Sequence, residues 1–170
     1  MSPLALADVN ALDRDAFVRL LGPAFESSPW VAEEAFAARP FADLEALQRA
    51  MASALDRAPA ERVLELVRAH PDLAGKAAIA GELTDASTRE QASAGLDRLT
   101  PEEHRRFHAL NAAYRQRFGF PFVVCVREHT RESILRAFEQ RLGNDRDAEL
   151  AAALAEVRKI ASLRLSELLT

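Results

Sequence analysis

The chain has 170 residues, of which 49% are hydrophobic and 28% are charged, and its formal net charge is −4. This balance predicts one globular domain over 1–170 rather than a disordered chain. No basic block stands out and no apolar run approaches the ~20 residues of a membrane span, so we expect neither a nucleic acid nor a membrane as partner.

The chain ends and the single cysteine indicate a compartment. Residues 1–8 have no basic stretch ahead of their short apolar run, so a signal peptide is not expected. Residues 167–170 do not form a peroxisomal address. Cys125 has no second cysteine for an internal disulfide and fits a reducing compartment, so we expect a cytoplasmic protein.

Several helices are predicted before residue 70, where the strong helix formers Ala, Leu, Arg and Glu dominate. Asn10 is expected to cap the first helix, and the Gly22-Pro23 pair to end it. Ser28 is expected to cap the second helix, with Pro29 at its first position. This helix is predicted over 30–38, and Pro40 closes it. Apolar residues on one face predict two more helices over 43–57 and 59–70.

His70 stands where the fourth of these helices breaks. Pro71 disfavours helical backbone for the residue before it, so the helix should stop at His70. The negative end of the helix dipole favours the protonated imidazole there, and histidine titrates nearest to neutral pH. This position suits a proton donor or acceptor, although a histidine that only caps the last carbonyls fits the same pattern.

The rest of the chain is also predicted to be helical, apart from two segments. Residues 71–83 contain two glycines and no sustained period, which indicates a loop. The apolar run Phe120–Val126 is either a buried strand-like segment or an irregular one, and periodicity does not decide between them. Capping signals at Thr84 or Asp85, Thr100 and Thr130 start three helices, and a fourth is predicted over 145–168. The predicted fold is an all-α, single-domain multi-helix bundle with one short extended segment near 120–126.

Polar residues share one face of the helix after the loop. Ser87, Glu90, Gln91 and Ala94 have the spacing i, i+3, i+4 and i+7. Three of the four are polar and could converge on a small polar ligand. A solvated helix face gives the same pattern.

A cation interrupts the apolar stripe of the last helix. The stripe runs from Leu150 to Leu168 in steps of four and three, and Arg164 stands on it. A guanidinium on a core face needs an anionic partner. An internal carboxylate such as Glu90, an anionic ligand, or water reached by the long side chain would each satisfy it. If a ligand is the partner, Arg164→Leu should not lower the melting temperature.

Three further features allow more than one interpretation. The backbone of Phe120–Val126 needs hydrogen-bond partners, which either a buried sheet or a planar amide-rich ligand would supply. Cys125 is expected to be an inert buried thiol, and a nucleophilic pair with His70 is the alternative. His104 and His108 have the spacing of a zinc pair but no evident third ligand, so we interpret them as surface residues.

Five stretches together resemble the family of 2-oxo-4-hydroxy-4-carboxy-5-ureidoimidazoline (OHCU) decarboxylases. They cover 70–76, 81–84, 87–96, 110–126 and 160–165, in the order of the family. The resemblance implies an all-helical enzyme of urate degradation that needs neither cofactor nor metal and commonly forms a homodimer. It also implies that the enzyme decarboxylates its small ureide substrate stereospecifically to (S)-allantoin.

The resemblance assigns roles to particular residues. It implies that His70 is the catalytic proton donor, that Glu90 is its acidic partner, and that Arg164 is the arginine of the family. The positions that match substrate-binding positions of the family are Pro71, Ser87, Thr88, Arg89, Gln91, Phe122, Val123, Val124, Cys125 and Val126.

The bonds of this substrate suggest a mechanism. Loss of carbon dioxide pushes two electrons into a neighbouring ring C=N, so the substrate is its own electron sink. His70 would then protonate one face of the enol-like intermediate. Two other classes remain open, namely a Cys–His hydrolase that uses Cys125 and a non-catalytic helical module that binds a ureide or purine.

Overall fold

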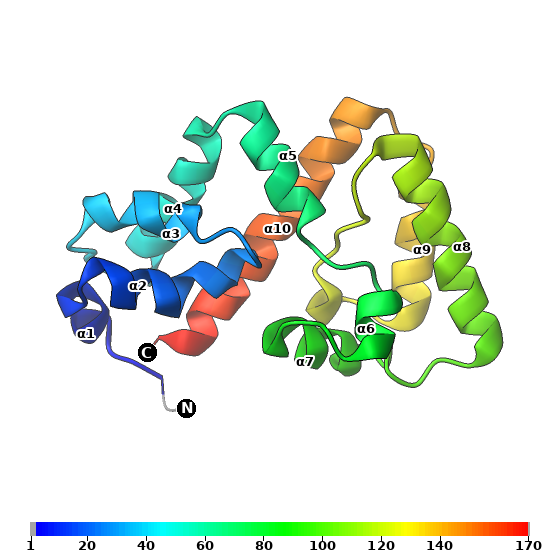
Figure 1. Ribbon diagram of the computed structural model, residues 1–170, viewed down its shortest axis with the longest axis horizontal. Coiled ribbons are helices and arrows are strands. Elements are labelled where there is room, and N and C mark those ends of the chain that lie inside the picture. The colour runs from blue at the N-terminus through cyan, green and yellow to red at the C-terminus, as the bar shows by residue number, and fades with distance from the viewer. Residues whose placement is uncertain (1–2, 170) are drawn as a thin grey trace. The chain divides into compact units, whose positions relative to one another are not determined.

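The computed structural model describes residues 3–169, and its regular structure is helical (Figure 1). Among these residues the only β-type pairing is an isolated bridge between Leu4 and Leu169. None of the described helices combines the length and the apolar character that a membrane span requires. The predicted all-α class is confirmed.

The chain divides into two compact units, which are described separately. Unit 1 consists of Met1–Ala69 and Arg158–Thr170, and unit 2 of His70–Val157. The boundary falls inside the last helix, α10 (Arg146–Leu168), which therefore contributes its first part to unit 2 and its second part to unit 1.

Unit 1 packs short helices around buried Phe17, Leu47 and Met51. Here α3 packs against both α2 and α4. The elements before residue 70 are α1 (Leu6–Ala11), α2 (Arg14–Leu21), η1 (Gly22–Phe25), α3 (Trp30–Ala35), η2 (Phe36–Ala38), α4 (Leu44–Arg57) and α5 (Ala60–Arg68). The helices predicted over 43–57 and 59–70 are confirmed to within two residues.

Two predicted caps in unit 1 are wrong. Asn10 lies inside α1, and Asp13 caps α2 by accepting a hydrogen bond from the Ala16 N–H at 2.8 Å. The Asn10 amide instead donates to the Phe41 carbonyl at 2.9 Å and accepts from the Phe41 N–H at 2.8 Å. Its two-sided amide thus pairs both backbone groups of one distant residue. Ser28 is buried, and α3 has no side-chain cap.

Unit 2 contains the elements that carry the predicted site. They are α6 (Lys76–Ala80), α7 (Asp85–Ser93), α8 (Pro101–Phe118), η3 (Val126–Glu128), α9 (Arg131–Arg141) and the first part of α10. Thr84, Thr100 and Thr130 cap α7, α8 and α9, as predicted. Residues 120–125 lie between α8 and η3 with no regular structure, so the irregular interpretation of this apolar run is confirmed.

The loop predicted over 71–83 contains the short helix α6, so this part of the prediction is wrong. Gly75 precedes the helix and Gly81 ends it in the left-handed conformation at φ 72°. A helix of five residues between two glycines is too short to show an apolar period, which is why the sequence pattern did not reveal it.

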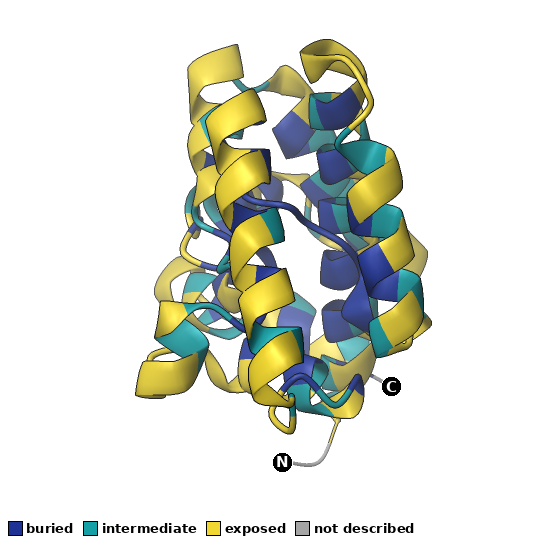
Figure 2. Cartoon of the chain, turned by 90° about the vertical axis from the view of Figure 1, so that its right-hand side faces the viewer, coloured by how far each residue is buried: buried dark blue, intermediate teal, exposed yellow. Residues whose placement is uncertain are grey.

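Aromatic rings form the core of unit 2. Tyr114 on α8 contacts four of these rings, with centroid distances between 4.6 and 5.9 Å, those of Phe118, Phe120, Phe122 and Phe138. Phe122 in turn stacks on Phe138 at 3.8 Å. The opposite face of α8 is mainly exposed (Figure 2). The apolar run 120–126 is therefore anchored in the core by its aromatic side chains.

Candidate functional site

His70 follows Ala69, the C-cap of α5, and is the first residue of unit 2. The predicted break before Pro71 is confirmed, since α5 ends at Arg68 and Ala69 is its C-cap. The imidazole is buried, with 4% of the residue exposed. Protein groups, and not water, therefore surround the imidazole.

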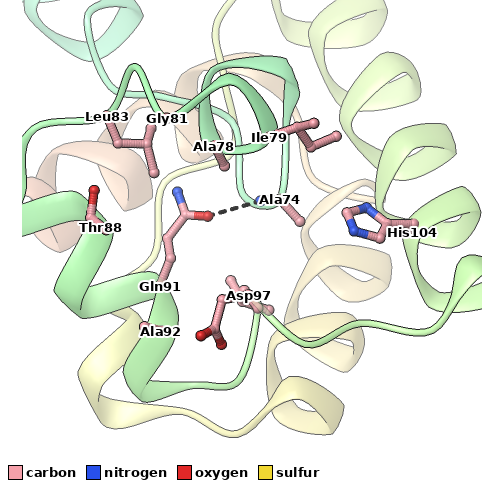
Figure 3. Close-up of a pocket in the computed structure, with 11 residues that line it drawn as sticks. Ala74, Ala78, Ile79, Gly81, Leu83, Thr88, Gln91, Ala92, Asp97 and His104 are labelled. Atoms are coloured by element: carbon pink, nitrogen blue, oxygen red, sulfur yellow. Dashed lines mark hydrogen bonds between the residues drawn. The ribbon is translucent and has the colours of Figure 1, made fainter.

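Side chains of α7 and α8 hold the loop after His70 in place. Gln91 accepts a hydrogen bond from the Ala74 N–H at 3.0 Å (Figure 3). It also donates to the Asp72 carbonyl at 3.4 Å. Asn111 donates to the Leu73 carbonyl at 2.9 Å, and Arg115 pairs with the Asp72 carboxylate at the same distance. These bonds restrain the backbone that leads out of His70.

The same loop has two unusual backbone positions. Ala74 has a positive φ of 51°, which costs an L-residue of order 1–3 kcal/mol. A Cβ at Gly75 would lie 2.7 Å from the Cβ of Asp72, so a larger residue does not fit without a shift. The surrounding hydrogen bonds offset this strain.

The polar face of α7 is only partly solvated. Ser87 and Gln91 are buried and Glu90 is half-buried, whereas Thr88 and Arg89 are exposed. The interpretation as a fully solvated helix face is therefore wrong. Because α7 packs against η3, this polar face belongs to the same part of unit 2 as the end of the apolar run.

The backbone of the apolar run is held by two side chains. The Val123 carbonyl accepts a hydrogen bond from Arg141 Nη1 at 2.7 Å, and the Cys125 N–H donates to the Glu156 carboxylate at 2.7 Å. Val124, between them, is buried. Within the described part of the chain its own N–H and C=O make no hydrogen bond. A buried residue with both backbone groups unused is unusual.

The Cys125 thiol is unsuited to nucleophilic attack. The residue is 1% exposed. Burial raises the pKa of the thiol, and the negative charges of Glu128, Glu156 and Glu90 raise it further. The thiolate is therefore disfavoured, which agrees with the expected inert thiol. The influence of Glu90 also indicates that its carboxylate lies near the apolar run.

Arg164 lies in unit 1 and is buried there. Its Nη2 donates to the Glu26 carboxylate at 2.7 Å, and its Nη1 to the Pro23 carbonyl at 3.3 Å. The interpretation that Arg164 extends into water is wrong. The alternative of an internal carboxylate partner is confirmed, but that partner is Glu26 and not Glu90. Glu26 has φ 51° and ψ −126°, a strained backbone conformation for a residue with a side chain.

A buried ion pair in unit 2 was missed by sequence reasoning. Glu149 is fully buried and forms an ion pair with Arg141. It also accepts hydrogen bonds from the Tyr114 hydroxyl at 2.7 Å and the Asn144 amide at 3.0 Å. Burial and the bond to Glu149 raise the pKa of Tyr114, so this hydroxyl keeps its proton.

Glu149 was missed because the buried face of α10 is offset from the apolar stripe that the sequence shows. Glu149 and Ala153 are buried on α10, whereas Leu150 and Leu154 are half-buried. The buried stripe therefore begins one residue earlier than the apolar pattern indicates. The one available signal was that Glu149 stands directly before Leu150, where the predicted apolar stripe begins.

A cavity of about 290 Å³ lies beside Gln91 (Figure 3). Its lining includes Thr88 and Gln91 from α7, Asp97, and His104 from α8. His104 is half-buried, so it is not a simple surface residue, whereas His108 is exposed. Residues 3–169 contain no group of three side chains placed to ligate a metal ion.

Comparisons with known proteins identify one family. The model of the OHCU decarboxylase family matches residues 10–166. The chain is 44% identical to the 2-oxo-4-hydroxy-4-carboxy-5-ureidoimidazoline decarboxylase of Halalkalicoccus jeotgali, over 99% of this chain and 93% of that protein. It is 46% identical to the decarboxylase of the same name from Haloferax volcanii, over 98% of this chain and 97% of the relative.

A solved structure is also similar. The crystal structure of an (S)-allantoin synthase superposes with a TM-score of 0.77 and 30% sequence identity. The match covers 99% of this chain and 54% of that one, so the chain spans about half the length of this structural relative.

Proposed function

The chain belongs to the OHCU decarboxylase family, and we propose that a site around His70 in unit 2 carries out its reaction. The chain is a decarboxylase that acts on OHCU in urate degradation and yields (S)-allantoin. The observation that supports this site best is the loop from His70 to Gly75, which side chains of α7 and α8 hold in a defined conformation.

We propose that both units act together as one domain over 1–170. The family model covers parts of both units, which supports this proposal. A cytoplasmic homodimer is proposed on the resemblance and on the single cysteine. Light scattering coupled to gel filtration would measure the mass in solution, and a monomer at all concentrations would contradict the dimer.

The chemistry begins with cleavage of the bond between the carboxylate and the hydroxyl-bearing ring carbon. Carbon dioxide leaves, the released electron pair forms a C=C bond to the carbon that bears the ureido group, and the former C=N pair moves onto the ring nitrogen, which takes up a proton. The resulting enol-like intermediate then takes a proton on the carbon that bears the ureido group, while its hydroxyl loses a proton and becomes the ring carbonyl of allantoin. His70 is proposed to deliver this proton, and a positioned acid of this kind typically accelerates a reaction by ~10²–10⁴-fold. Because the acid stands on one side, one enantiomer forms.

The polar face of α7 and the backbone of 122–126 are proposed to bind the substrate. Glu90 would orient His70 or accept hydrogen bonds from ureido N–H groups. Ser87 and Gln91 are buried on the same helix, and Thr88 and Arg89 flank them. The unused backbone groups of Val124 suit a ureide, which offers both donors and acceptors. Pro71 restrains the backbone next to His70.

Arg164 is proposed to bind negative charge of the substrate. This role rests on the match to the arginine of the family and on the two parallel N–H donors of a guanidinium, which suit a carboxylate. A firm hold on the departing carboxylate would stabilise the ground state and slow the reaction. The guanidinium should therefore act on charge that develops during the reaction.

The alternative classes have weaker support. A Cys–His hydrolase needs a thiolate, and the surroundings of Cys125 disfavour it. A non-catalytic binding module would bind ureides without consuming OHCU.

Product chirality tests the proposed function. OHCU is generated from urate with urate oxidase and hydroxyisourate hydrolase, and the circular dichroism of allantoin is followed with and without the protein. Spontaneous decay gives racemic allantoin, so a single (S) enantiomer that forms faster with the protein supports the enzyme. Racemic product at the uncatalysed rate would refute it.

A further inference from the structure

We propose that Arg141 and Glu156 are positioning residues, which fix residues 123 and 125 and so present the Val124 backbone to the substrate. The proposal rests on the proposed function, because it assumes that this segment binds the ureide. Neither residue is among the positions that the family resemblance assigns to the site. Both belong to unit 2, as does the segment they hold.

The two contacts flank a single residue. Arg141 donates to the carbonyl of Val123, and Glu156 accepts from the N–H of Cys125, both at 2.7 Å. Each bond involves a charged group, and charge-assisted hydrogen bonds are shorter and stronger than neutral ones. The backbone on either side of Val124 is thereby restrained, while the Val124 N–H and C=O make no hydrogen bond in the described residues.

Arg141 is itself held firmly. Its guanidinium pairs with the buried carboxylate of Glu149 and lies 4.5 Å from the centroid of the Phe122 ring. Tyr114 and Asn144 supply further donors to Glu149. Burying an ion pair costs free energy unless hydrogen bonds satisfy its remaining groups. This network satisfies Glu149 and directs Nη1 of Arg141 at the Val123 carbonyl, while Nη2 is buried without a hydrogen-bond partner in the described residues.

The arrangement matches the chemistry of a ureide. A residue that presents one N–H donor and one C=O acceptor can pair with an N–H and C=O of the ligand. An irregular segment without such restraints would lose conformational entropy on binding, which weakens affinity. We therefore expect Arg141 and Glu156 to act mainly on KM, since they do not contact the carbon that is protonated.

Glu156→Ala is the main test, with Glu139→Ala as matched control. Glu156 is half-buried, so the variant should fold. Glu139 pairs its carboxylate with Arg106 on the exposed side of α9, away from the segment that Glu156 holds. We expect Glu156→Ala to raise KM about tenfold, the loss that one charge-assisted hydrogen bond can cause, with kcat within about twofold. Glu156→Gln keeps an acceptor and should recover most of the affinity.

A second measurement needs no substrate. Hydrogen exchange of the peptide that contains 120–126 should be faster in Glu156→Ala than in the wild type, and unchanged in Glu139→Ala. Unchanged exchange, or a KM equal to that of the wild type, would overturn the proposal. If the wild type forms no (S)-allantoin, the proposed function fails, yet the exchange measurement still decides whether Glu156 holds the segment.

Arg141→Lys examines the other contact. Lysine keeps the charge opposite Glu149 but lacks the planar fork that reaches both Glu149 and Val123. We expect a several-fold rise in KM with a smaller change in kcat. A variant with wild-type KM would remove Arg141 from the proposal.

Discussion

At the scale of single residues, the buried polar groups are the informative ones. His70, Glu149 and Arg164 are all buried. Burial without a compensating partner is costly, so such residues persist either for structure or for function. Glu149 and Arg164 each take part in a buried ion pair, and His70 lies at the start of the loop that α7 and α8 hold.

Replacing His70 by Asn should remove most of the stereospecific activity. Asparagine fills part of the same space but cannot transfer a proton near neutral pH, so turnover should fall by ~10²-fold or more. Measurement of (S)-allantoin formation by circular dichroism checks this. His108→Asn on the exposed side of α8 is the control. A folded His70→Asn variant with near wild-type turnover would exclude the proposed role.

Treatment of the native protein with a thiol alkylator should leave activity intact, because the buried Cys125 should hardly react. A raised pKa lowers the thiolate fraction at any given pH, and the thiolate is the species that reacts. Native protein treated with iodoacetamide at pH 7.5 should therefore react slowly, as mass spectrometry would show, whereas denatured protein reacts fully. Rapid labelling with loss of activity would instead support the Cys–His hydrolase.

Replacing Arg164 by Leu should destabilise the protein. The sequence pattern alone favoured the opposite result, because leucine extends an apolar stripe. The bond to Glu26 changes this expectation, since the variant leaves a buried carboxylate without its cation, at a cost of about 3–5 kcal/mol. Chemical denaturation measures the loss. Glu26→Gln in the Arg164→Leu background should restore part of it, and a single variant as stable as the wild type would contradict this account.

At the scale of elements, α7 has two tasks. Its polar face carries the proposed binding residues, and Gln91 on that face also fixes the loop after His70. One helix thus connects substrate binding to the position of the proposed acid. The cap at Thr84 fixes where this helix starts.

Gln91→Ala should therefore lower both stability and activity. The buried N–H of Ala74 would lose its acceptor, which costs about 1–3 kcal/mol. Thermal unfolding and steady-state kinetics measure the two effects. Gln116→Ala, on the exposed side of α8, is the matched control and should change neither. Full activity in Gln91→Ala would show that the loop keeps its position without this amide.

At the scale of the whole molecule, ligand binding should stabilise the folded chain. A ligand that binds only the native state at 100 times its Kd adds about 2.7 kcal/mol to the free energy of unfolding. We expect (S)-allantoin to raise the melting temperature in a concentration-dependent way, and (R)-allantoin to do so less. Equal effects of both enantiomers, or none, would contradict a stereospecific site.

The sequence by itself determined the helical class and most helix boundaries. Prolines, capping residues and the 3.6-residue period are local signals, and they located α4, α5, α7 and α8. The family motifs likewise lie in continuous stretches. Helix α6 was not predicted, because a helix of five residues is too short to show a 3.6-residue apolar period.

Only the tertiary structure decided the partners of buried charges. Glu26 and Arg164 are 138 positions apart, and Val123 and Arg141 are 18 positions apart. No periodicity relates such pairs, because their distance depends on how the helices pack. The same reason explains why the residues that hold Val124 became visible only in the folded chain.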